Sequence, residues 1–169
     1  THCVIHNSSL DGWMAKSGIY LRYGYRGSYT TEQANTIESC TSFNSGGVAM
    51  YHYGPGPNHL IKNHFFNAGI YSGDISGTYL PYGKRAQGST IAYNWVHAIR
   101  GIGMRCDSWG DEIYIHHNVV WNAQAGCKWQ GQKPLFIYNN TYFVNNQKSP
   151  LMLAEMTNPK EGVIQGADH

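Results

Sequence analysis

The chain has 169 residues, 12 Lys and Arg against 10 Asp and Glu, and a charged fraction of 13%, about half of what a typical soluble domain carries. Its length suits a single domain over residues 1–169. The sequence has no run of basic residues and no apolar stretch of the roughly 18 residues that a transmembrane helix needs, so we expect neither a nucleic-acid partner nor a membrane. Gly, Asn and Tyr abound while long stretches of helix-forming residues are missing, so we expect an all-β fold.

A seven-residue motif recurs along the chain, centred on Asn7, Cys40, Asn63, Asn94, Asn118 and Asn140. Three residues before each centre stands an aliphatic residue: Val4, Ile37, Leu60, Ile91, Ile115 and Ile137. Three residues after it stands a large, mostly aromatic residue: Leu10, Phe43, Phe66, His97, Trp121 and Phe143. We expect both columns to point inward and the Asn side chains to form a hydrogen-bonded ladder at a bend.

A second motif follows each copy, at residues 18–22, 47–51, 69–73, 101–105, 126–130 and 150–154, and five of these six segments begin with Gly. The segments alternate with the period of two that is typical of strands. Successive Asn or Cys centres are 22 to 33 residues apart, which is a solenoid repeat length plus insertions. The sequence therefore predicts a parallel β-helix of about six coils. Because residue 1 already lies inside a repeat, we expect one β-helix domain excised from a larger chain.

These columns resemble the right-handed β-helix repeat family, the fold of pectate-lyase-like polysaccharide lyases and of several glycoside hydrolases. The resemblance covers roughly residues 1 to 155. It also extends to the architecture of β-helical carbohydrate-binding modules attached to enzymes that degrade xylan or pectin. It implies a secreted bacterial protein, extracellular or at the cell surface, with a polysaccharide as partner. Covalently attached catalytic or further β-helix domains are expected beside it.

The outward positions of the Gly-led strands predict a binding surface, since aromatic rings stack on sugar C–H groups while guanidinium and amide groups bond to hydroxyls. We expect a linear, neutral or weakly charged plant cell-wall polysaccharide, with xylan favoured, because a polyuronate would require a denser basic groove. The ligand-binding residues expected are Tyr20, Arg22, Tyr51, Tyr71, Arg105, Lys128 and Gln130, with Tyr82 and Trp109 from neighbouring loops.

Whether this surface also catalyses a reaction is left open. A lyase needs a base and a group that neutralises a carboxylate, and the catalytic candidates are Arg105, Lys128, Asp107 and His52. A glycosidase needs two carboxylates, for which Asp107 and Asp111 are available, although they also suit a simple local turn. We favour a non-catalytic binding module. The alternatives are a polysaccharide lyase or glycoside hydrolase acting in the same groove, and a structural or adhesive solenoid.

No resident cofactor is expected, although calcium at Asp107 or Asp111 is left open. We expect no zinc or copper site, because His116 and His117 should point to opposite faces of a strand and His97 should pack in the interior. The cysteines on adjacent coils fall in different columns, which predicts thiols without disulfide bonds, mostly buried, at Cys3, Cys40, Cys106 and Cys127.

Overall fold

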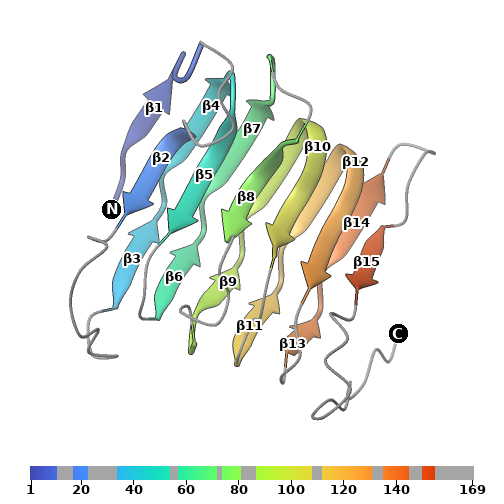
Figure 1. Cartoon of the computed structure of the whole chain (residues 1–169). Helices are drawn as coiled ribbons and strands as arrows, with labels where there is room; N and C mark the ends of the chain where they lie inside the picture. The colour runs from blue at the N-terminus through green and yellow to red at the C-terminus, as the bar shows by residue number, and fades with distance from the viewer. Residues whose placement is uncertain are drawn as a thin grey trace.

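The computed structural model describes residues 1–10, 17–22, 34–53, 57–71, 74–80, 87–107, 112–130, 135–144 and 150–154. In this part of the chain every strand pairs with its neighbours in parallel, and the strands stack into a solenoid with three faces (Figure 1). β1 and β2 lie at one end of the stack, and β14 and β15 lie at the other.

The three faces are named here in the order in which a full coil passes through them. The first face consists of β3 (Asn35–Glu38), β6 (Asn58–Ile61), β9 (Thr90–Ala92), β11 (Ile113–His116) and β13 (Leu135–Tyr138). The second consists of β1 (Val4–His6), β4 (Thr41–Ser45), β7 (His64–Ala68), the first halves of β10 (Trp95–Cys106) and β12 (Val119–Gln130), and β14 (Thr141–Val144). The third consists of β2 (Ser17–Arg22), β5 (Val48–Tyr53), β8 (Ser76–Leu80), the second halves of β10 and β12, and β15 (Leu151–Ala154).

The parallel β-helix predicted from the repeats is confirmed. The chain makes four full turns between β3 and β13, and part-turns before and after them bring the second and third faces to six stacked strands each. The prediction of about six coils therefore counts the incomplete turns at both ends. β10 and β12 are long because each passes from the second face to the third without a break, with a register shift between Ile99 and Ile102.

The core lies inside the stack as one continuous cluster. The predicted aliphatic column is confirmed for the first face, where the strand register aligns Ile37, Leu60, Ile91, Ile115 and Ile137. A column of small residues lines the corner between the second and third faces. A Cβ atom on Gly103 would lie 2.3 Å from Cγ1 of Val120, and one on Gly77 would lie 2.4 Å from Cγ1 of Val96. The same Cβ atoms would lie 2.6 Å from the backbone carbonyl oxygens of Gly126 and Gly103, respectively, so only glycine fits these two positions without a shift of the backbone.

The predicted Asn ladder is confirmed over Asn63, Asn94, Asn118 and Asn140. Each amide Nδ2 donates to Oδ1 of the next Asn, at 3.0 Å from Asn63, 2.9 Å from Asn94 and 2.9 Å from Asn118. The same Oδ1 atoms accept a backbone N–H from the preceding coil, and each Nδ2 also donates to a backbone carbonyl, as Asn94 does to Leu60. One side chain per coil thus satisfies buried backbone groups that would otherwise lack partners.

The predicted alignment of the first motif copy is wrong by four residues. β1 pairs with β4 through Val4 and Thr41, which brings Cys3, not Asn7, into the column of Cys40 and Asn63. Asn7 lies instead at the next corner, where its Oδ1 accepts a hydrogen bond of 3.0 Å from Asn44. The corners at the two ends of the second face each place a residue in the left-handed region: Asn7 itself at φ 53°, and at the ladder corner the residue before the Asn, such as Tyr93 at φ 58°. Asn thus occurs at both corners for different reasons, because it tolerates the left-handed conformation at one and forms the ladder at the other.

The predicted direction of the aromatic column is also wrong. On β7 the side chain of Phe65 is buried in the core, whereas His64 and Phe66 point outward; on β10 Val96 is buried between Trp95 and His97. The left-handed residue before each Asn or Cys centre interrupts the alternation, so a count from one strand to the next does not carry across the bend. The aromatic column therefore lies on the outside of the second face.

Candidate functional site

On the third face, one outward column brings together several of the predicted ligand-binding residues. The strand register aligns Tyr20, Tyr51, Tyr79, Arg105 and Lys128 on consecutive strands. Tyr79 was not predicted, since its segment was assigned to an insertion. The signal was present, because Tyr79, Arg105 and Lys128 each follow a corner glycine by two residues, at Gly77, Gly103 and Gly126.

Tyr71, which was predicted to belong to this column, does not. It lies in the bend between β7 and β8, where its backbone N–H donates to the carbonyl of Gly46. Of the strand expected at 69–73, the described residues 69–71 form a bend, with Gly69 at φ 83°, and the strand of this coil is β8.

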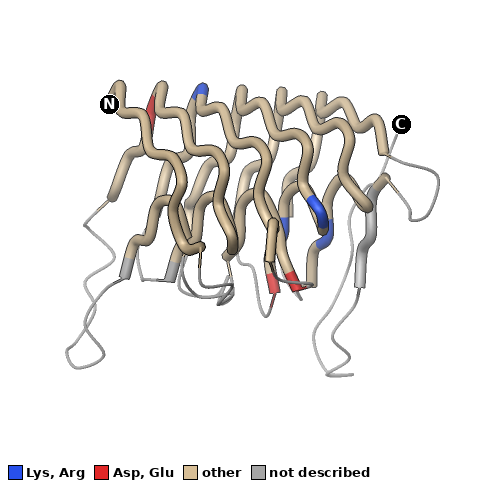
Figure 2. Tube along the Cα trace, turned by 90° about the horizontal axis from the view of Figure 1, so that it is seen from above, with Lys and Arg blue, Asp and Glu red and all other residues tan. Residues whose placement is uncertain are grey.

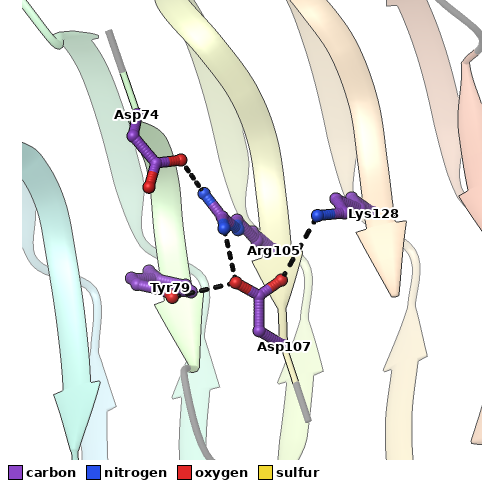
Figure 3. Close-up of polar contacts among 5 residues, drawn as sticks. All are labelled: Asp74, Tyr79, Arg105, Asp107 and Lys128. Atoms are coloured by element: carbon purple, nitrogen blue, oxygen red, sulfur yellow. Dashed lines mark hydrogen bonds and ion pairs between the residues drawn. The ribbon is translucent and has the colours of Figure 1, made fainter. Parts of the chain in front are cut away.

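A polar cluster surrounds Asp107, which directly follows β10, two residues after Arg105 (Figure 3). Oδ2 of Asp107 accepts hydrogen bonds from the hydroxyl of Tyr79 at 2.9 Å and from Arg105 at 2.5 Å. The other arm of the Arg105 guanidinium donates to Asp74, and Lys128 Nζ lies 3.6 Å from Oδ1 of Asp107. The Arg105 guanidinium also lies 4.7 Å from the centre of the Tyr79 ring, within the range of a cation–π interaction.

The protonation states of this cluster follow from its contacts. Burial would raise the pKa of Asp107, but hydrogen bonds from Arg105 and Tyr79 and two positive charges hold it below its ordinary value of 3.8. Burial opposes the charge of Arg105, yet its hydrogen bonds to Asp107 and Asp74 and the charge of Asp107 raise its pKa. Burial and the charge of Asp107 raise the pKa of Tyr79. At neutral pH Arg105 is therefore a fixed cation that neutralises charge and does not accept a proton.

The cluster does not fit the calcium ion that the sequence left open at Asp107. Its carboxylate lies between Arg105 and Lys128, and both cations would repel a divalent ion. Asp111 lies outside the described residues. Throughout the described part of the chain, no three His, Cys, Asp or Glu side chains gather around one point where a metal ion could bind.

The tyrosine part of the column is less open than predicted. Tyr20 is 42% exposed, but Tyr51 and Tyr79 are each 7% exposed and pack with Val48 in a small buried cluster. Tyr51 therefore offers little surface for stacking on a sugar. Gln130 is half-buried at the end of β12. Three other predicted ligand-binding groups, the Arg22 side chain, Tyr82 and Trp109, lie outside the described residues.

His52 points into the solenoid, which contradicts its predicted contact with a sugar. The register aligns it with Leu21, and it is 3% exposed. Burial lowers its pKa to about 4, so its ring is neutral at neutral pH. The ring therefore lies away from every surface where a polysaccharide would bind.

The most continuous aromatic surface lies on the second face, where one ring per coil forms a stack that we call the aromatic strip: His6, Phe43, Phe66, His97, Trp121 and Phe143. Neighbouring ring centres are 5.1, 4.8, 5.0 and 4.1 Å apart from His6 to Trp121, and the ring planes differ by at most 17°. This surface was not predicted, because the column was expected to face the interior.

Trp95 lies beside the aromatic strip in a different orientation. Its ring makes angles of 84° with His64 and 74° with Trp121, and it is 58% exposed. From His6 to Trp121 the rings of the strip cover one another's faces, whereas Trp95 lies across the stack. Trp95 is thus more exposed than Phe43, Phe66, His97 and Trp121, which are all half-buried in the stack. Charged residues are sparse along most of the described tube (Figure 2).

Two histidine pairs on the outer surface differ from the prediction. His97 lies in the aromatic strip, and its Nε2 is 2.8 Å from Nε2 of His64 on the preceding coil. His116 and His117 do not point to opposite faces, because His117 has φ 55° at the corner and its Nδ1 lies 2.9 Å from Nδ1 of His116.

Comparisons with known proteins agree with this architecture. A family profile described as "Right handed beta helix region" matches residues 1–148. Two curated relatives, both named "Pectate lyase 3", come from Pectobacterium carotovorum and Pectobacterium carotovorum subsp. carotovorum; each is 25% identical over 134 residues, which is 77% of this chain and 34% of the relative. The chain thus spans about a third of their length.

A comparison with solved structures finds no significant match. Among the described residues, no helix is long and apolar enough to cross a membrane. The family profile covers most of the chain, and the stacked parallel strands supply the architecture that it describes. The chain belongs to the right-handed β-helix family.

Proposed function

We propose that this chain is a non-catalytic carbohydrate-binding module that holds a linear plant cell-wall polysaccharide, of the xylan type, along its second face. The observation that carries the proposal is the aromatic strip together with the exposed ring of Trp95. Both curated relatives are named as pectate lyases, and this supports a polysaccharide as the ligand.

The regular spacing of the aromatic strip suits a polymer with a regular repeat. Each coil rises by one strand spacing of about 4.8 Å, so a glycan lying along the solenoid axis would meet an equivalent side chain at every coil. The ring of Trp95 would stack on the apolar C–H face of one sugar. The strip and its neighbours His64 and Asn67 supply imidazole and amide groups that can form hydrogen bonds with sugar hydroxyls. Because these side chains are uncharged, the surface favours a neutral glycan.

Affinity gel electrophoresis on xylan, mannan, glucan and pectin tests the proposal. Retardation on xylan is expected for the unmodified chain, and W95A should weaken the binding by about 2- to 10-fold, since an aromatic stacking contact contributes roughly 0.5 to 1.5 kcal/mol. Y114A is the matched control, because Tyr114 is an exposed ring on the first face, stacked on Phe136. The proposal fails if no glycan retards the chain, or if Y114A and W95A weaken binding equally.

The second candidate is a polysaccharide lyase with its groove on the third face, favoured by the position of Arg105 beside Lys128 on consecutive coils. Arg105 would neutralise a uronate carboxylate, and Lys128 would be the candidate base. Incubation with pectate would then release unsaturated products that absorb ultraviolet light, and K128A would abolish this release while W95A would retain it. A hydrolase would instead produce reducing sugar without the ultraviolet signal.

A further inference from the structure

The pair His64 and His97 forms a compact nitrogen site on the second face. His64 is the first residue of β7 and His97 the third residue of β10, so they lie diagonally across adjacent strands. Their Nε2 atoms are 2.8 Å apart and their ring centres 5.0 Å apart. Both side chains are half-buried, and they lie on the outer side of the second face, since the intervening residues Phe65 and Val96 point into the core.

The surrounding rings hold both histidines in place. His97 is stacked between Phe66, with ring centres 5.0 Å apart, and Trp121, with ring centres 4.1 Å apart. The ring centre of His64 lies 4.6 Å from that of Phe66 and 6.1 Å from that of Trp95, and the planes of His64 and Trp95 make an angle of 84°. The two nitrogen atoms are therefore positioned before any ligand arrives, which reduces the entropy cost of binding.

Both imidazoles favour the neutral state that a metal ion requires. Burial lowers the pKa of His64, and burial together with the charge of His64 lowers the pKa of His97. Near neutral pH one ring donates its Nε2 hydrogen to the other. Moving that hydrogen to Nδ1 of the same ring would leave two neutral nitrogen lone pairs directed at one point.

We propose that His64 and His97 together bind one divalent transition-metal ion of the nickel, copper and zinc class, with water as the remaining ligands. Imidazole nitrogen is a preferred ligand of these ions. Two nitrogen atoms that each lie about 2.1 Å from a shared ion, at angles of 90° to 110°, are roughly 3.0 to 3.4 Å apart. The present separation of 2.8 Å needs only a small rotation of the rings. The proposal does not depend on glycan binding.

Isothermal titration calorimetry with NiCl2 near pH 7.5 tests the site. H97F keeps the stack, because Phe already occupies the same column in Phe43 and Phe66, and it removes the ligand nitrogen. H64T removes the other nitrogen and introduces the residue of the neighbouring position, Thr41. Each variant should lose at least roughly tenfold in affinity, the lower limit for loss of even an outer-shell partner.

H116Q serves as the matched control, since it disrupts the other histidine pair and leaves this one intact. It should retain the affinity of the unmodified chain to within about twofold. Circular dichroism checks that each variant is folded. If H97F does not fold, the affinity of H64T for Ni²⁺ alone tests the proposal. The proposal is overturned if the unmodified chain binds no Ni²⁺, if neither H97F nor H64T weakens binding, or if H116Q weakens it as much as they do.

Discussion

At the scale of single residues, the direction of a side chain depends on strand register more than on its neighbours in sequence. His52 follows an outward tyrosine on β5 and was expected at the surface, but its position faces the core, in register with Leu21. Leu80 lies in the same inward column two coils beyond Leu21, because Tyr79 and Tyr51 are paired. A neutral imidazole thus occupies a place that suits leucine.

This placement predicts a pH-dependent contribution of His52 to stability. The pKa of His52 is about 4 in the folded chain, against an ordinary value of 6.5. As the pH falls from 6.5 to 4, the unfolded chain takes up a proton that the folded chain does not, so stability falls over this range by up to about 3 kcal/mol. In urea unfolding, H52L should lose less stability than the parent between pH 7.5 and pH 4.5. Equal losses in the two proteins would contradict the buried position of His52.

At the scale of elements, the Asn ladder is the feature that was most predictable from sequence. Four successive copies carry Asn at one position and an aliphatic residue three positions earlier, and a repeated column must have a repeated environment. What the repeats did not reveal is the residue before each Asn, such as Tyr93 at φ 58° or His117 at φ 55°. These left-handed residues change the direction of the chain, and for that reason the aromatic column was placed inside when it lies outside.

A buried Asn of the ladder should contribute far more to the free energy of unfolding than an exposed Asn at the next corner, such as Asn67. Asn94 is fully buried, and N94A would leave the Asn63 N–H and the Leu60 carbonyl without their partner. The expected cost is about 3 kcal/mol or more. N67G is the control, because Asn67 is exposed and glycine accepts its positive φ, so the cost should stay below about 1 kcal/mol. Thermal or urea unfolding measures both, and similar losses would refute the difference.

The polar cluster on the third face was predictable only in part. Arg105 and Lys128 were correctly expected on the outer surface of consecutive coils, but in neighbouring columns; the register aligns them in one column, since Arg105 follows Gly103 by two residues as Lys128 follows Gly126. The role of Asp74 was not predictable, since Asp74 precedes a strand that the repeats did not reveal, whereas Tyr79 was missed although it follows Gly77 by two residues. The burial of Tyr51 depends on packing between coils, which no repeat pattern encodes.

At the scale of the whole molecule, the stack separates an interior that excludes solvent from an outer surface. All four cysteines lie in the described part of the chain, and none forms a disulfide, as predicted. The predicted separation of Cys3 and Cys40 is wrong, because they occupy one column on adjacent coils, and a hydrogen bond with Cys40 raises the pKa of Cys3. Cys40, Cys106 and Cys127 are buried, whereas Cys3 is exposed.

This separation predicts the reactivity of the thiols towards a water-soluble disulfide reagent. In the reduced, folded chain only Cys3 should react within minutes, and all four thiols should react once the chain is unfolded in urea. Burial also raises the pKa of Cys127, which further suppresses its thiolate. Absorbance of the released thiolate counts the groups. Rapid reaction of more than one thiol in the folded chain would contradict the closed interior.

The Asn ladder has a consequence for how such a surface can evolve. Asn63 and Asn94 are 31 residues apart in sequence and Asn94 and Asn118 only 24, yet the amide bonds that join them measure 3.0 and 2.9 Å. The extra residues leave the spacing between coils unchanged. The ladder therefore fixes the distance between adjacent coils. Mutation can lengthen or shorten a loop while the residues of the neighbouring surface column keep their spacing. Loops and columns can then be selected independently of each other.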